Sequence, residues 1–157
     1  MRYIVFDIDG VLANSTAREE KYLIGKKRPD VDWDLFYKDV SNDPPIEAGI
    51  LVATALSLYN SGCKLMFVTG RNESVREQTL DWLSYQLLME KKDINLFMRP
   101  DGDISTNRAF KESIGELIGF KNIVIAFDDN GLAVRMWRDH GVTCYQTDSR
   151  VFRQNNY

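Results

Sequence analysis

Short apolar runs bounded by turn-forming residues alternate along the chain with segments whose apolar residues repeat at helical spacing. The runs that predict strands lie at residues 3–6, 64–68, 94–98, 122–127 and 142–146. Continuous runs of this length, rich in β-branched and aromatic residues, are typical of strands that are buried on both faces. Strands separated by helices predict an α/β fold with a doubly wound parallel sheet and right-handed crossovers.

The first long helix is predicted to start within residues 43–47, where two prolines and an acidic residue mark a helix start, and to run to about Asn60. Ser61-Gly62 ends it. Its apolar residues predict a stripe that faces the core, formed by Ile50, Leu51, Ala55 and Leu58.

Three further helices are predicted from the same spacing. They lie at residues 73–90, at 107–118, and through Val134 and Trp137 to His140. The buried face of the first of these three is predicted to comprise Val75, Trp82, Leu83 and Leu87.

Residues 12–46 form the least regular stretch, in which residues 32–37 could make one short helix. This stretch is polar and contains Arg18, Lys21, Lys26, Lys27 and Arg28. A long irregular segment in a compact domain is usually a lid or a binding loop. The alternative is a surface insertion whose aromatic residues dock on the core. In either case residues 13–46 are a small insert within a single domain that spans residues 1–157.

Composition narrows the classes of function. The chain has 157 residues, of which 44% are hydrophobic and 27% charged, and its net charge is −3. That charge argues against broad binding of duplex nucleic acid, but a small phosphorylated substrate or a strand end needs only a local basic patch. The absence of a signal-peptide pattern or a membrane-spanning run predicts a cytoplasmic protein. Cys63 and Cys144 show no metal-binding spacing and are predicted to be buried thiols. The oligomeric state stays open.

Two carboxylates follow the first strand directly, as Asp7 and Asp9, and Gly10 allows a sharp turn after them. Carboxylates this close repel each other unless a cation or a proton lies between them, so the pattern indicates Mg²⁺, acid–base chemistry or both. A calcium EF-hand is excluded, because its required glycine and glutamate would fall on Leu12 and Arg18.

Further polar residues come at the ends of the later strands. Thr69 ends the second strand, Asp128 and Asp129 follow the fourth, and Lys111 is on the helix before them. Because the carboxyl ends of parallel strands share one edge of the sheet, these groups are expected to meet there with Asp7. Carboxylate oxygens suit octahedral Mg²⁺, while a lysine and a hydroxyl suit phosphoryl oxygens. Arg108 is an alternative cation, but the spacing to Asp128 favours Lys111.

The order of these motifs resembles the haloacid dehalogenase (HAD) superfamily of phosphatases, which have a Rossmann-like fold. Within it, the chain is most similar to the 3′-phosphatase domain of phage polynucleotide kinase. That likeness also includes Thr69-Gly70-Arg71, Met136-Trp137-Arg138, Gly141-Val142, Cys144 and Gln146. No G-x-x-x-x-G-K-[ST] motif occurs in the chain, so phosphatase activity without kinase activity is expected.

The resemblance implies a mechanism and a ligand set. Asp7 would attack phosphorus and form an aspartyl-phosphate, and Asp9 would protonate the leaving oxygen and then activate water. Mg²⁺ would be bound by Asp7, by the backbone carbonyl of Asp9 and by Asp128, with Asp129 as a further ligand or partner. Thr69 and Lys111 would bind the phosphoryl oxygens. Gly70 and Arg71 are expected to contact substrate, with Arg71 reaching a second phosphate or a base.

The expected substrate is the 3′-phosphate end of a polynucleotide, and the alternative is a mononucleotide or another small phosphoester. Trp33, Tyr37 and the basic residues of 18–28 could contact a nucleotide. A response-regulator receiver also gathers aspartates, a threonine and a lysine, but in another order along the chain. A non-catalytic phosphate-binding module is the remaining alternative.

Overall fold

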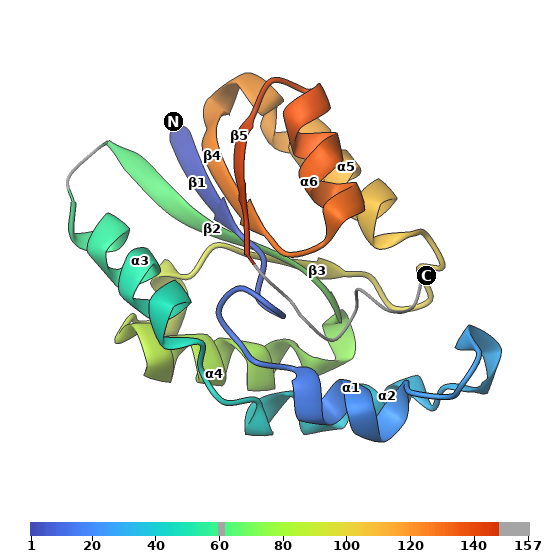
Figure 1. Cartoon of the computed structure of the whole chain (residues 1–157). Coiled ribbons are helices and arrows are strands. Elements are labelled where there is room, and N and C mark those ends of the chain that lie inside the picture. The colour runs from blue at the N-terminus through green and yellow to red at the C-terminus, as the bar shows by residue number, and fades with distance from the viewer. Residues whose placement is uncertain (60–61, 148–157) are drawn as a thin grey trace.

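A five-stranded parallel sheet in the order β3-β2-β1-β4-β5 forms the centre of the computed structural model (Figure 1). The structure describes residues 1–59 and 62–147, apart from the side chain of Arg28. The strands are β1 (Arg2–Phe6), β2 (Cys63–Asn72), β3 (Leu96–Arg99), β4 (Ile123–Asp128) and β5 (Thr143–Gln146). The predicted α/β fold with a doubly wound parallel sheet is confirmed. β1 lies in the middle, so the residues that follow it reach the centre of the carboxyl edge.

Helices cover both faces of the sheet (Figure 1). α3 (Glu47–Leu58) and α4 (Arg76–Leu87) pack on one face, and α5 (Asn107–Ile118) and α6 (Gly131–Asp139) on the other. Alternate residues of β1 serve the two cores, because successive side chains of a strand point to opposite faces. Ile4 and Phe6 belong to the α3–α4 core, whereas Val5 belongs to the α5–α6 core.

The helices at 107–118 and through Trp137 are confirmed. The segment at 73–90 is shorter than predicted, because a 3₁₀ turn (Glu73–Val75) precedes α4 and the left-handed residue Leu88 ends it. Its predicted apolar face is buried as expected. Residues 148–157, together with Asn60 and Ser61, lie outside the described residues.

The predicted inner stripe of α3 is confirmed at Ile50, which packs against the core, and is wrong at Leu51, Ala55 and Leu58, which are exposed. Leu51 and Leu58 are 69% and 81% exposed, and the buried residue of this helix is Ala53. α3 is apolar on all sides, so its sequence does not tell which side faces the sheet. Gly49 decides this, since a Cβ there would lie 2.0 Å from the carbonyl oxygen of Val11. The small-residue side therefore packs inward. The helix begins at Glu47, after both prolines.

β2 continues further than predicted. Thr69, Gly70 and Arg71 belong to the strand, which reaches Asn72 after a register shift against β3. These residues are therefore part of the sheet and do not form a loop after it.

The insert is more regular than predicted. It contains two helices, α1 (Thr16–Tyr22) and α2 (Trp33–Lys38), which lie side by side (Figure 1). α2 corresponds to the short helix expected at 32–37, and α1 was missed. α1 buries Arg18 and Glu19 in place of apolar residues, so it has no hydrophobic stripe to reveal it.

Neither cysteine lies in a disulfide. Cys144 is buried and Cys63 is half-buried. Burial raises the pKa of the Cys144 thiol to about 12, which keeps it protonated and unreactive at neutral pH. Among the described residues, no helix is long and apolar enough to cross a membrane.

Candidate active site

Lys111 joins two strand ends in the interior. Its Nζ lies 2.6 Å from Oδ2 of Asp7, at the end of β1, and 2.7 Å from Oδ2 of Asp128, at the end of β4. Lys111 is fully buried, and Asp7 and Asp128 are 4% and 1% exposed. Trp137 also donates from Nε1 to Asp128 Oδ2 at 3.1 Å. The structure thus brings together Asp7, Asp128 and Lys111, whereas Arg108 lies 3.8 Å from Glu112 near the surface.

Asp7, Asp128 and Asp129 gather negative charge at one point. Each offers a carboxylate oxygen, and these oxygens all lie within 4.8 Å of one another. Burial raises the pKa of Asp7 well above its ordinary value, and the charges of Asp128 and Asp129 raise it further, while Lys111 lowers it in part. One ammonium group therefore does not fully balance the three carboxylates. An all-oxygen, electron-rich donor set of this kind fits Mg²⁺.

Gly10 lets the chain pass closely beside this cluster. Its φ is +78°, and a Cβ at this position would lie 2.4 Å from Oδ2 of Asp129. Its carbonyl oxygen accepts a hydrogen bond from Thr147 at 2.8 Å. A side chain at residue 10 would therefore displace Asp129 from its position.

Asp9 lies on the other side of the turn, held by two guanidinium groups. Arg71 contacts it through Nη2 at 2.7 Å and through Nε at 3.2 Å, and Nη2 of Arg18 lies 2.8 Å from it. Burial acts to raise the pKa of Asp9, but Arg71 and Arg18 outweigh it and hold that pKa at about 2. Asp9 is therefore ionised at neutral pH, and its side chain is still 28% exposed.

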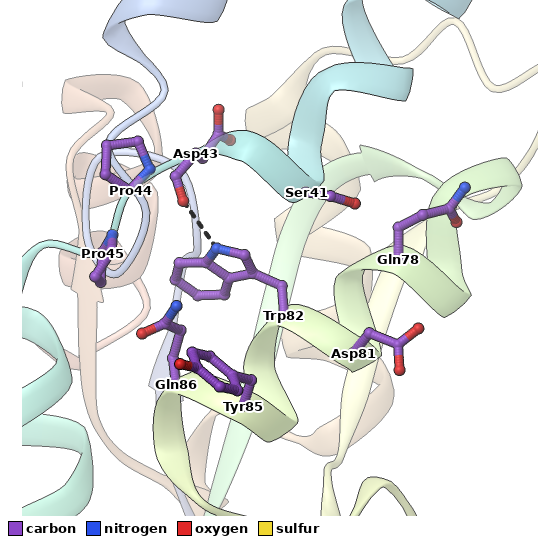
Figure 2. Close-up of a pocket in the computed structure, with 9 residues that line it drawn as sticks. All are labelled: Ser41, Asp43, Pro44, Pro45, Gln78, Asp81, Trp82, Tyr85 and Gln86. Atoms are coloured by element: carbon purple, nitrogen blue, oxygen red, sulfur yellow. Dashed lines mark hydrogen bonds between the residues drawn. The ribbon is translucent and has the colours of Figure 1, made fainter.

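Asp43 completes the arrangement on the far side of the two arginines. Its Oδ2 accepts from Nη2 of Arg18 at 2.8 Å and from Nη2 of Arg71 at 3.0 Å. Figure 2 shows its backbone carbonyl facing Trp82, whose Nε1 donates to it at 2.8 Å, while the carboxylate points away. The loop before α3 is thereby fixed to α4, and Asp9 and Asp43 are linked by two arginines.

A pocket of about 420 Å³ lies beside Trp82, and Figure 2 shows the side chains that line it. Its walls include Pro44, Pro45 and Tyr85. Apart from Asp43, none of the residues around the two arginines lines it, and neither do the predicted site residues. This pocket is therefore separate from the carboxylate cluster at the carboxyl edge of the sheet.

The other predicted residues lie within β2. Thr69 is fully buried, and its Oγ1 accepts from the backbone N–H of Arg71 at 3.2 Å. The carbonyl oxygen of Gly70 accepts from the hydroxyl of Tyr37 at 3.2 Å, so α2 of the insert contacts this strand. Arg71 differs from its predicted placement. It is 0% exposed and turned toward Asp9 and Asp43, so it does not reach outward to a second phosphate or a base.

Arg18 and Asp43 were not predicted as site residues from the sequence. Arg18 was counted among the basic residues of 18–28 that could contact a nucleotide and not as a partner of Asp9, and Asp43 was counted only as part of a helix start. Arg18 follows Asp9 by nine residues, but Asp43 lies 25 residues from Arg18 and 28 from Arg71, so no local spacing reveals how these groups pair. The only available signal was an arginine in a polar stretch soon after Asp9.

Arg18→Gln is expected to lower the rate of phosphate release by about 10²-fold, because Asp9 loses one of the two groups that orient and charge-balance it. The rate should be measured with a small generic phosphomonoester, so that binding of a larger substrate does not affect the result. Arg108→Gln is the matched control, since Arg108 is 3.8 Å from its partner near the surface. A rate for Arg18→Gln within twofold of this control would contradict a role for Arg18 in the site.

Glu19 is a second buried charged residue on α1. It is 6% exposed and accepts a short hydrogen bond from the hydroxyl of Ser15. Burial raises the pKa of Glu19 to about 7, helped by the charges of Asp9 and Asp129, while the Ser15 hydrogen bond and Arg18 lower it in part. The ionised form is therefore disfavoured in the folded protein.

The free energy of unfolding is expected to fall as the pH rises from about 4.5 to about 7, because the folded state then binds more protons than the unfolded state. The loss due to Glu19 is at most about 3 kcal/mol. Glu19→Gln should remove this part of the slope and be more stable than the parent at pH 8. Urea unfolding across this pH range in chelator measures both effects. An unchanged slope in the variant would contradict the raised pKa.

A doubly wound sheet with a carboxylate pair after β1, a hydroxyl on β2, and a lysine and two carboxylates around β4 defines a phosphatase of the haloacid dehalogenase superfamily. A family model for the polynucleotide kinase PNKP phosphatase domain matches residues 1–152, and the chain belongs to this family. The predicted resemblance is confirmed. Membership in a phosphatase family also excludes the response-regulator interpretation.

Solved structures show the same fold. Two structures of the Pnkp1/Rnl/Hen1 RNA repair complex contain chains with a TM-score of 0.69, at 20% and 21% identity over 94% of this chain. This chain spans only 42% and 46% of those longer chains. The class C acid phosphatase from Bacillus anthracis with tungstate bound has a TM-score of 0.63 at 19% identity, covering 96% of this chain and 68% of its own.

Proposed function

We propose that this domain is a Mg²⁺-dependent phosphomonoesterase that removes the 3′-phosphate from a polynucleotide end through an aspartyl-phosphate at Asp7. The observation that carries the proposal is the buried Lys111, which joins Asp7 to Asp128 beside a cluster of three carboxylates. Residues 1–157 would act as one domain, with residues 13–46 as an insert at the site.

Asp7 is suited to be the nucleophile. Its Oδ1 accepts from the backbone N–H of Ile8 at 2.7 Å and its Oδ2 accepts from Lys111, so its orientation is fixed. The carboxylate must be ionised to attack phosphorus, yet burial raises its pKa. Bound Mg²⁺, held by Asp7, the backbone carbonyl of Asp9, Asp128 and Asp129, would supply positive charge to these carboxylates and to the phosphoryl group. Lys111 and Thr69 would contact the phosphoryl oxygens.

Asp9 would be the general acid and then the general base. Its pKa of about 2 leaves it ionised, which suits the activation of water in the hydrolysis step. Protonation of the leaving oxygen requires a higher pKa, and hence a weaker hold by Arg18 and Arg71. Among the described residues, Nη1 of each arginine is buried and has no hydrogen-bond partner, so Asp9 and Asp43 do not use every donor of the two arginines.

A polynucleotide end is the preferred substrate for two reasons. One structural match is a chain of an RNA repair complex. The insert also presents Lys26 and Lys27 at the surface, which could contact backbone phosphates despite the net charge of −3. Because Arg71 is turned inward, it acts in the proposal as a positioning residue for Asp9.

The test is phosphate release with Mg²⁺ from a 3′-phosphorylated oligonucleotide, a 5′-phosphorylated oligonucleotide and mononucleotides, with EDTA as the metal-free control. Strong preference for the first substrate would support the proposal. Preference for mononucleotides would favour the alternative, a small-phosphoester phosphatase. Activity that EDTA leaves unchanged would contradict the Mg²⁺ dependence.

Lys26→Ala with Lys27→Ala is expected to weaken binding of the oligonucleotide and to lower the slope of log K against log salt by about 1.4, or about 0.7 for each lost phosphate contact. Turnover of a mononucleotide should be unchanged. An unaltered salt slope would show that the strand does not follow this part of the insert.

A further inference from the structure

The outer face of α3 is apolar and exposed. Leu51 and Leu58 are 69% and 81% exposed, and Tyr59, just after the helix, is 69% exposed. Between Glu47 and Lys64 the sequence contains no charged residue. Soluble domains rarely present a contiguous face of this kind without a partner.

The exposed face of α3 is separate from the face of the same helix that packs against the core. Ala53 is buried in the core, and Ile50 and Leu56 pack against it. A helix that is apolar on every side is normally covered on every side. The exposed side has its own regular pattern, because Ala48, Leu51, Ala55 and Leu58 are separated by three, four and three residues. That is the spacing of the seam by which one helix packs along another.

We propose that a second copy of this chain covers the face, with the two α3 helices antiparallel about a two-fold axis near residue 53. In this arrangement the residue numbers of facing pairs sum to the same value. Leu51 faces Ala55 of the second copy, and Leu58 faces Ala48 of the second copy. Each leucine then meets an alanine at all four positions, so that large and small side chains interdigitate. An isologous interface requires this self-complementarity, and the alternation of alanine and leucine supplies it.

Charge also favours a second copy as the occupant. The seam formed by Ala48, Leu51, Ala55 and Leu58 has no charged residue that could pair with a charged docking segment. An identical seam from a second copy buries no charge against it. At the ends of the pair, Tyr59 comes level with Glu47 of the second copy, which places a hydroxyl donor near a carboxylate. The seam is about three turns long, so the interface is smaller than the roughly 1,200–2,000 Å² of stable interfaces, and weak association with a dissociation constant in the high micromolar range is expected.

Sedimentation velocity from about 1 to 500 µM tests the proposal, a range that spans the expected dissociation constant. The parent chain should pass from monomer to dimer, and Leu58→Lys should stay monomeric with unchanged activity and circular dichroism. Leu117→Lys is the matched control, since Leu117 is 72% exposed on α5, and it should dimerise like the parent. A parent that is monomeric throughout, a dimeric Leu58→Lys variant, or a monomeric Leu117→Lys variant would overturn the proposal.

A mixing experiment tests the antiparallel register. Leu51→Lys and Ala55→Glu are each expected to be monomeric alone, because each places like charges close to the two-fold axis. Mixed in equal amounts they should form a heterodimer, since the lysine introduced in one variant then faces the glutamate introduced in the other. A parallel pair would place residue 51 opposite residue 51, so a mixture that stays monomeric would refute this arrangement.

Discussion

Asp7→Asn is expected to lower phosphate release by roughly 10⁴-fold or more, with the fold intact, because an amide cannot attack phosphorus to form the acyl-phosphate. Without Mg²⁺, the free energy of unfolding of the variant should equal or exceed that of the parent. The raised pKa of Asp7 means that its ionised form is unfavourable in the folded protein above its unfolded pKa. The substitution removes that unfavourable charge, while Lys111 keeps Asp128 as its partner.

The measurement pairs single-turnover phosphate release with urea unfolding in chelator. Asp34→Asn is the control, because Asp34 is an exposed residue of α2 and its loss should leave both values unchanged. Retention of a tenth or more of the parent activity by Asp7→Asn would rule out Asp7 as the nucleophile. A large loss of stability would instead give Asp7 a structural role.

Lys111→Met is expected to destabilise the metal-free protein by about 3–5 kcal/mol, because it leaves Asp7 and Asp128 buried without their common cation. Mg²⁺ should restore part of this loss if it binds the same carboxylates. A ligand at about 100 times its dissociation constant adds about 2.7 kcal/mol. Activity should also be lost, since Lys111 would contact the phosphoryl oxygens in the proposed mechanism.

Urea unfolding with chelator and with Mg²⁺ measures both parts of this prediction. Lys121→Met removes an exposed lysine and should change stability by no more than about 0.5 kcal/mol. If Lys111→Met is as stable as this control in chelator, the two carboxylates do not depend on Lys111. If Mg²⁺ raises the free energy of unfolding of the parent and of both variants by the same small amount, the carboxylate cluster is not the metal site.

Among the site residues, Asp9 is expected to show the largest change in pKa between the free and the substrate-bound protein. Two arginines hold it ionised, with a pKa of about 2, whereas the proposed first step requires it to carry a proton. In the free enzyme Asp9 is therefore ionised, which is the form that the proposed hydrolysis step requires. The exposed part of its side chain shows that solvent already reaches it.

The pattern of apolar runs was enough to predict the sheet and the residues at its carboxyl edge. Strands that are buried on both faces are continuous apolar runs, so their ends are visible in the sequence, and parallel strands bring those ends together. For this reason Asp7, Asp128 and Lys111 could be grouped from their positions along the chain, and the structure brings Lys111 rather than Arg108 to the two carboxylates.

The pairing of the charged interior residues depends on contacts between segments that are distant in the sequence, and it could not be predicted. α1 buries Arg18 and Glu19 and has no apolar stripe, so hydrophobic spacing did not reveal it. Arg71 turns inward because Asp9 and Asp43, distant in sequence, meet it there. The face of α3 was decided by the close approach of Gly49 to Val11 and not by its apolar residues, which lie on all sides. Hydrophobic periodicity reports which residues avoid water, whereas ion pairs and close backbone contacts depend on which segments become neighbours in space.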